Sequence, residues 1–236
     1  MKKIYYFILY LSLLEFAFGY GDTLFYNLSV YGLKCGELSY TSQENNRLTI
    51  KTNSSGLIDY IFPFKNEYDV LFDSSTFIIK NYSKNIKQGE FKQKLKGEWN
   101  PSTNSIEYEN LSSFKRPNPC LSIFSFLFML NQKSYKYLDT KWFDLEHEGN
   151  LFKSRVLLSE SVNLTYNGKS ISSHHFRFDL IPKSNTIKML DRSDYFSQNI
   201  THPKAIKQIW VSKTPKKKIL KASVKIGLIE IIATLK

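Results

Sequence analysis

The sequence predicts an all-β protein that contains a large antiparallel meander and one short buried helix. Apolar and polar residues alternate with a period of two along most of the chain, as in strands that bury one face. Turn signals such as Asn-Asn, Asn-Pro and Asn-Gly separate these runs, as in antiparallel hairpins. The chain is 42% hydrophobic and 15% aromatic, which is enough apolar surface for a folded core.

The first predicted strand covers residues 24–31, where every second residue is apolar. Asn167-Gly168 is the clearest hairpin signal, because these residues accept the positive φ values of a two-residue type I′ turn. Further strands are predicted at 36–43, 47–55, 68–73, 76–83, 90–99, 141–148, 152–166, 170–181 and 207–213.

Residues 118–132 are nearly all apolar and predict the one helix. Asn118 is a favourable N-cap, and Pro119 suits the first helical position. The run is too short to cross a bilayer. It also lacks the polar face of a lid or interfacial helix that touches lipid, so we expect it in the core.

The chain ends in a lysine-rich segment, residues 207–236, whose pattern is that of strands. Leu220, Ala222 and Val224 alternate with polar residues, and the apolar set shifts after Gly227. Such a shift predicts a bulge or a tight bend. Residues 182–206 read as a long loop between strands, so we expect one β-rich domain over residues 20–236.

Residues 1–19 have the features of a secretory signal peptide. Two lysines precede an apolar run over residues 4–16, and the small residues Ala17 and Gly19 suit a signal peptidase. The alternative is an uncleaved anchor, but the run is shorter than the roughly 20 residues of a membrane span. Removal of this peptide leaves 31 basic and 20 acidic residues, a formal charge of +11, and no transmembrane segment is expected in the remaining chain.

Two rows of lysines are candidates for binding an anionic partner such as lipid headgroups or an acidic glycan. Lys92, Lys94 and Lys96 alternate along one predicted strand, and Lys221 and Lys225 along another. The alternative is an ordinary solvated strand face that resists pairing with other sheet edges. Nucleic acid is not an expected partner, because export removes the chain from the cytoplasm and no nucleic-acid-binding motif occurs.

An acidic strand is the main candidate for catalysis. Alternation within residues 141–148 places Asp144, Glu146 and Glu148 on one face and His147 on the other. Two carboxylates could serve as acid and base in a hydrolase, although acids in strands more often face lysines across the sheet. No nucleophile, metal or nucleotide motif occurs, and no cofactor is expected.

His174 and His175 are adjacent in a predicted strand, so they point to opposite faces and cannot easily hold one metal ion. His174 shares a face with apolar residues and is expected in the core, with ligand binding as the alternative. His175 is expected at the surface as a partner of Asp179.

Cys35 and Cys120 are the two cysteines of the chain. In an exported protein they could form a disulfide. We expect two buried thiols instead, with the Cys35–Cys120 disulfide as the alternative.

Several stretches occur in the order found in a known family. They are Tyr31-Gly32 with Gly36-Glu37, SSGLIDYIFPFKNEYDVLFD at 54–73, the apolar helix, QIWVS at 208–212 and GLIEIIATL at 227–235. Over nearly all of the mature chain, the sequence resembles the exported bacterial family known as domain of unknown function 3108. It departs from the family at Lys213-Thr214-Pro215-Lys216, where an acidic turn is usual.

The resemblance implies a large antiparallel sheet curled into an open or flattened barrel, in the periplasm or cell envelope. No activity is established for the family, so no catalytic residue is transferred. We expect a non-enzymatic binding or scaffold module for a lipid, a glycan or a partner protein. The alternative is an envelope hydrolase that uses the acidic strand from Asp144 to Glu148.

Overall fold

The computed structural model describes residues 21–109, 111, 113–183 and 190–236. The predicted signal peptide at 1–19 lies outside the described residues, as does the part of the predicted loop at 184–189. Within the described ranges, no helix combines the length and the apolar character needed to cross a membrane.

One fifteen-stranded sheet holds most of the regular structure. Neighbouring strands follow the order β8 to β1 and then β15 to β9, because the first strand, β1, pairs with the last strand, β15. Neighbours are antiparallel except β9 and β10. The strands are β1 (Thr23–Val30), β2 (Leu33–Ser42), β3 (Arg47–Ser54), β4 (Phe64–Phe72), β5 (Ile79–Gln88), β6 (Phe91–Asn100), β7 (Ser105–Tyr108), β8 (Ser113–Lys115), β9 (Leu121–Ser122), β10 (Phe143–His147), β11 (Asn150–Tyr166), β12 (Lys169–Pro182), β13 (Ile206–Ser212), β14 (Ile219–Ile226) and β15 (Ile229–Leu235).

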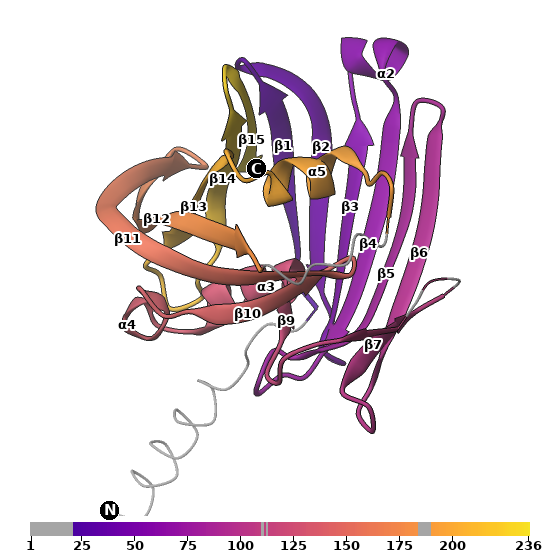
Figure 1. Ribbon diagram of the computed structural model, residues 1–236. Helices are drawn as coiled ribbons and strands as arrows, with labels where there is room; N and C mark the ends of the chain where they lie inside the picture. The colour runs from indigo at the N-terminus through magenta and orange to yellow at the C-terminus, as the bar shows by residue number, and fades with distance from the viewer. Residues whose placement is uncertain (1–20, 110, 112, 184–189) are drawn as a thin grey trace, which may run out of the picture.

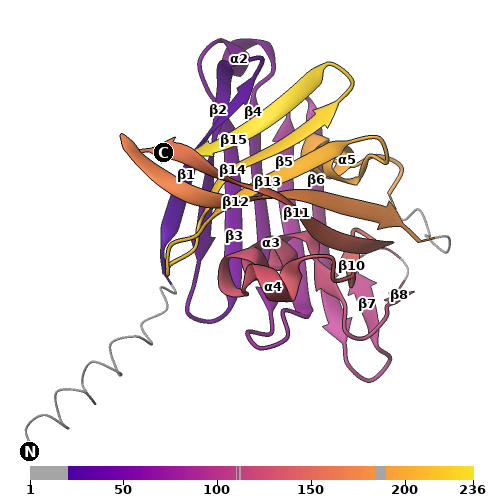
Figure 2. The same ribbon diagram turned by 90° about the vertical axis from the view of Figure 1, so that its left-hand side faces the viewer.

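The sheet curls into an open, flattened barrel (Figure 1). In Figure 2, strands β11–β15 cross in front of β2–β6, so the two halves of the sheet form layers that face each other. The edge strand β9 also contacts the opposite half of the sheet, through a bridge between its Leu121 and Ile78, which lies just before β5. The predicted all-β fold with an antiparallel, curled sheet is confirmed.

Helix α3 (Ile123–Gln132) is the predicted buried helix and lies inside the curl. It begins later than expected, and Ser122 rather than Asn118 is its N-cap. The backbone N–H of Ser125 donates to Ser122 Oγ over 2.9 Å, and the N–H of Ser122 donates to Ser125 Oγ over 3.0 Å. This reciprocal pair satisfies two amides that the first helical turn leaves unbonded, so the start predicted at Asn118-Pro119 is wrong.

Turns with positive φ set the hairpins. The predicted type I′ turn joins β11 to β12, with φ of 49° at Asn167 and 72° at Gly168. Gly227, with φ of 57°, lies in the tight turn that separates β14 from β15. The strand predicted at 76–83 begins only at Ile79, because Phe77 has a φ of 61° in the preceding turn.

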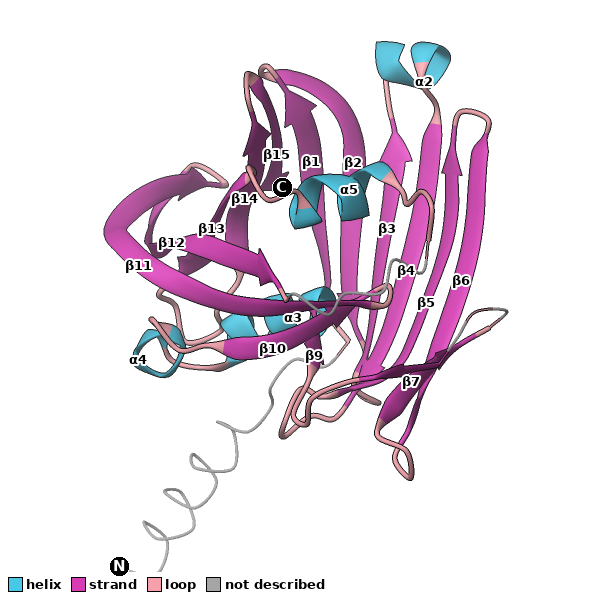
Figure 3. Ribbon diagram, in the orientation of Figure 1, coloured by secondary structure: helices cyan, strands magenta, loops and turns pink. Residues whose placement is uncertain are grey.

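The described part of the chain also contains short helices that were not predicted: α2 (Leu57–Ile61), α4 (Tyr135–Leu138) and α5 (Tyr195–Thr201) (Figure 3). Helix α5 lies within the segment predicted as a loop. Asp194 caps it by accepting a hydrogen bond from the Ser197 N–H over 3.0 Å. Two turns of helix are too short to produce an apolar period that sequence analysis detects.

The cysteines are both free. Cys35 lies near the start of β2. Its carbonyl accepts a hydrogen bond from the N–H of Ser55, just after the end of β3. The carbonyl of Cys120 accepts a hydrogen bond from the N–H of Ile79 at the start of β5. The start of β5 lies at the opposite ends of the strands from the start of β2. The alternative of a Cys35–Cys120 disulfide is therefore contradicted, and Cys35 is only partly buried.

Phe126 of α3 tests how much the core depends on this helix. Its fully buried ring packs against Phe143 and Phe178 at centroid distances of 5.4 and 5.3 Å. We expect Phe126→Ala to lower the free energy of unfolding by about 3–5 kcal/mol, because it leaves a cavity in a close-packed region. Urea unfolding measures this. The control Phe25→Ala, at a side chain that is 54% exposed, should change stability little, and an equal loss in both variants would contradict the expectation.

Candidate functional site

An apolar cavity of about 170 Å³ lies inside the curl of the sheet. Strands β1–β4 line one side, strands β12–β15 line the other, and α3 and α5 contribute aromatic and aliphatic side chains from within. An apolar cavity of about 150 Å³ is large enough to bind a benzene-sized molecule. The space here is therefore sufficient for an apolar group of a ligand.

The cavity exists because two small residues meet across neighbouring strands. Ala222 of β14 and Ala233 of β15 are directly paired, and Ile209 and Leu28 flank them in the same row of the sheet. Larger side chains at the two alanines would fill the space. This row therefore provides the floor of the cavity.

The two ends of the cavity differ in chemistry. Phe124 and Leu127 of α3 contribute to its lining at one end of the curl. Toward the turn between β14 and β15, the lining contains Val224, Ile231 and Lys207, which lie in one row of paired residues. Among the lining residues that the structure describes, Lys207 is the one with a charged side chain.

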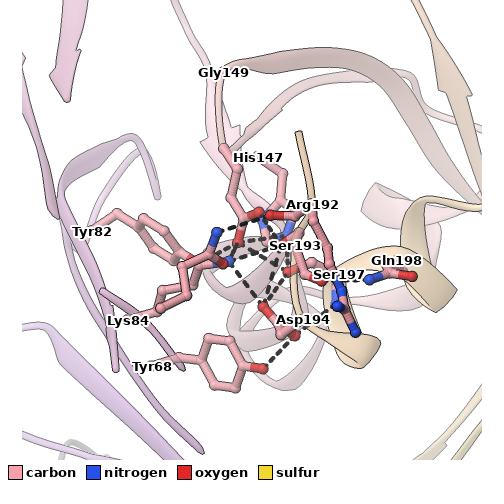
Figure 4. Close-up of polar contacts among 12 residues, drawn as sticks. Tyr68, Tyr82, Lys84, His147, Gly149, Arg192, Ser193, Asp194, Ser197 and Gln198 are labelled. Atoms are coloured by element: carbon pink, nitrogen blue, oxygen red, sulfur yellow. Dashed lines mark hydrogen bonds and ion pairs between the residues drawn. The ribbon is translucent and has the colours of Figure 1, made fainter. Parts of the chain in front are cut away.

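Helix α5 forms part of the cavity wall through Phe196 and Ile200, and a buried charge cluster holds it in place (Figure 4). Lys84 Nζ of β5 lies 2.6 Å from Glu148 Oε1 in the β10–β11 turn and 3.0 Å from Asp194 Oδ2 at the N-terminus of α5. All three side chains are almost fully buried. The cluster thus ties α5 to both layers of the sheet.

Neutral donors complete this cluster. The hydroxyl of Tyr68 donates to Asp194 over 2.7 Å, and the hydroxyl of Tyr82 donates to Glu148 over 3.0 Å. Burial opposes ionisation of Asp194, but the charge of Lys84 and the hydrogen bonds from Ser197 N–H and Tyr68 outweigh it and lower the pKa of Asp194. Both carboxylates are therefore ionised at neutral pH.

Ser197 and His147 also meet in this cluster, at 2.9 Å between Oγ and Nε2. The Ser197 hydroxyl lies 3.0 Å from a carboxylate oxygen of both Glu148 and Asp194. A catalytic triad needs the acid on the other imidazole nitrogen, whereas Glu148 lies 3.7 Å from the same Nε2. Because Ser197 is also buried, the arrangement serves to anchor α5.

The residues proposed for a hydrolase are not brought together. On the outer side of the sheet, Asp144 forms two ion pairs. Its Oδ1 lies 3.1 Å from Lys153 Nζ and 2.5 Å from Lys183 Nζ. Glu146 is buried and accepts hydrogen bonds from the Tyr108 hydroxyl and from a backbone amide. His147 points instead to the cluster around Lys84 (Figure 4).

Glu148 departs from the predicted alternation. It was expected on the same face as Asp144 and Glu146, but it lies in the turn after β10 with a φ of 53°. The turn rotates its side chain to the Lys84 cluster, on the side of His147. Period-two alternation holds only within a strand, so this expectation is wrong.

The lysine rows lie on the outer surface, away from the cavity. Lys92 and Lys94 are exposed on β6, and Lys96 forms ion pairs of 3.1 Å with Glu98 and Glu109. On β14, Lys221 lies over the Trp210 ring at 4.6 Å and Lys225 is exposed. Since β6 and β14 are far apart in the sheet order, the two rows form no common basic site.

The two histidines of β12 also differ from expectation. His174 is half-buried and contacts the Tyr135 ring of α4 at a centroid distance of 4.6 Å, outside the main cavity. His175 is buried, stacks on Trp210 at 4.3 Å and lies 3.2 Å from Glu160. It was expected at the surface beside Asp179, but the bulge of β11 near Leu158 brings Glu160 opposite His175.

An apolar rim surrounds the ends of the strands nearest to Lys207. It comprises three connections, β1–β2, β3–β4 with α2, and β14–β15, which the sheet order brings to the same end (Figure 1). Leu57, Tyr60 and Leu228 are 80%, 90% and 86% exposed. The other exposed members are Tyr31, Leu33, Ile61 and Ile229. This end of the sheet therefore exposes several large apolar side chains to solvent.

Glu146 provides a pH-dependent test of the buried interior. Burial raises its pKa from 4.5 to about 7, against the opposing hydrogen bonds from Tyr108 and Gly149. The folded protein therefore keeps a proton that the unfolded chain releases, and stability falls as pH rises from about 4.5 to about 7. We expect Glu146→Gln to remove this loss, on the order of 3 kcal/mol at pH 8 relative to pH 4.

Urea unfolding across this pH range checks the expectation for Glu146. The control Glu90→Gln, at an exposed turn residue, should follow the parent protein at every pH. Parallel profiles of the parent and Glu146→Gln would contradict the assignment of a proton to Glu146.

Comparisons with known proteins support the fold alone. A solved structure, a beta-barrel-like protein of Domain of Unknown Function DUF1849 from Brucella abortus, is similar to this chain with a TM-score of 0.57 and 7% identity. The similarity covers 91% of this chain and 94% of that chain. No family model matches the sequence, and no curated protein matches it. The resemblance to domain of unknown function 3108 therefore stays a prediction, and what the comparison shows is a fold similar to that of this beta-barrel-like protein.

Proposed function

We propose that this protein is a non-enzymatic binding module that holds the apolar part of a lipid inside its curled sheet. The observation that carries this proposal is the cavity between β1–β4 and β12–β15. Ligand cavities are concave, mostly apolar and provided with a few polar groups. This cavity has such a lining, with one charged residue toward one end.

The chemistry of the lining favours a lipid over the other expected partners. A glycan would need many hydrogen-bonding side chains, because its hydroxyl groups lose water on binding. A partner protein would meet a concave pocket inside the curl of the sheet rather than a broad flat surface. The hydrolase alternative has less support, since Asp144, Glu146 and His147 point to three different environments.

A membrane is the proposed source of the ligand. The apolar rim lies at the same strand ends as Lys207, which lines the cavity there. Exposed Leu and Tyr side chains on turns can enter the interfacial region of a bilayer. The predicted signal peptide at 1–19 and the family resemblance support a place in the periplasm or cell envelope, where such a lipid source is present.

Ala233→Phe should block ligand uptake. Its aromatic ring would fill the floor of the cavity beside Ala222. We expect the uncharged apolar dye N-phenylnaphthylamine to bind the parent protein with enhanced fluorescence, and its affinity to fall at least about tenfold in the variant, because a ring-sized volume of apolar contact is removed.

The matched control is Thr234→Phe, which adds the same ring one residue further along β15, where the side chain is exposed. It should bind the dye like the parent protein. Circular dichroism of both variants shows whether the sheet is retained. If the folded parent protein takes up no dye, the cavity does not bind apolar ligands and the proposed function is wrong.

The rim should bind a lipid surface directly. We expect the parent protein to co-sediment with uncharged phosphatidylcholine vesicles, and the double variant Leu57→Ser, Leu228→Ser to bind them at least about tenfold more weakly, since each leucine contributes about 1.5–3 kcal/mol when buried. Phe25→Ser, at an exposed residue at the other end of β1, is the control. Equal binding by all three proteins would remove the rim as a docking surface.

A further inference from the structure

Lys207 is a second buried lysine, and its surroundings differ from those of Lys84. It is 3% exposed and lies at the cavity wall in the row of Val224 and Ile231. A lysine is almost never fully buried unless it is paired. Lys84 follows this rule through Glu148 and Asp194.

The contacts of Lys207 are of another kind. Its Nζ donates to the backbone carbonyls of Ala205 and His202, at 3.1 and 3.4 Å. Among the residues that the structure describes, no carboxylate forms an ion pair with it. An ammonium has three N–H donors, so these two bonds leave one donor, on a residue that lines the cavity.

The nearest acidic influence on Lys207 comes from Asp179, which is itself engaged. Asp179 accepts hydrogen bonds from Arg155 and Arg177, at 3.0 and 2.8 Å. Burial lowers the pKa of Lys207, and the charge of Asp179 opposes this only in part. An anion beside Nζ would favour the charged form and offset the cost of burying it.

We propose that Lys207 binds the headgroup of a single-chain carboxylate lipid, of which a fatty acid is the simplest, while the alkyl chain extends toward α3. The polarity of the cavity fixes this direction. Lys207 lies toward the apolar rim, and Phe124 and Leu127 lie at the other end. This inference rests on the proposed binding function and adds the class of headgroup.

The test compares dodecanoate with dodecanol, which share a chain and differ in charge. Each is used to displace N-phenylnaphthylamine from the folded protein at neutral pH. We expect dodecanoate to bind roughly 10- to 100-fold more tightly than dodecanol, which is the range for a hydrogen bond to a charged group. Lys207→Gln should reduce this preference to within about twofold, and Lys207→Arg should retain it.

Lys225→Gln is the matched control, because Lys225 belongs to β14 near the same end of the sheet but is exposed. It should keep the full preference for dodecanoate. If dodecanoate and dodecanol bind the parent protein equally, the headgroup assignment is wrong while the binding function stands. If neither displaces the dye, the lipid proposal is wrong as a whole. The comparison on the parent protein decides the question even if Lys207→Gln does not fold.

Discussion

The Lys84 ammonium joins three segments that are far apart in the sequence: β5, the turn after β10 and the N-terminus of α5. One lysine faces two ionised carboxylates in an interior where each unpaired charge would cost several kcal/mol. The hydroxyls of Tyr68 and Tyr82 supply the remaining donors. Such a fully bonded cluster has one arrangement of low energy, so it fixes the position of α5 between the layers of the sheet.

The cavity depends on that position. With α5 held, Phe196 packs on Phe124 of α3 at a centroid distance of 5.4 Å, so side chains of the two helices meet inside the open curl. The remaining space lies over Ala222 and Ala233. Protein interiors are close-packed, and an empty apolar space loses dispersion contacts on its walls. The proposed ligand site therefore rests on two small residues at a paired position, among larger apolar neighbours that would otherwise fill the space.

The sequence predicts the strands well, because period-two alternation and Asn167-Gly168 are local signals. It does not predict the site, because the site arises from pairings across the fold. Lys84 and Asp194 are 110 residues apart, and Asp194 lies in a segment without visible periodicity. The alanine pair becomes a cavity only when the register of β14 and β15 is known. Alternation also misplaces Glu148, since a turn with positive φ reverses the expected side.

The two buried lysines, Lys84 and Lys207, differ in what surrounds their charge. Lys84 is surrounded by protein carboxylates and hydroxyls, so a ligand has nothing to add there. Among the residues that the structure describes, Lys207 has hydrogen bonds to backbone carbonyls alone, and it lies at the wall of an apolar cavity near an exposed apolar rim. Carbonyl dipoles stabilise an ammonium less than a full negative charge does. The fold therefore leaves this charge incompletely satisfied at the position where the headgroup of a lipid entering past the rim would stay while its chain moves inward.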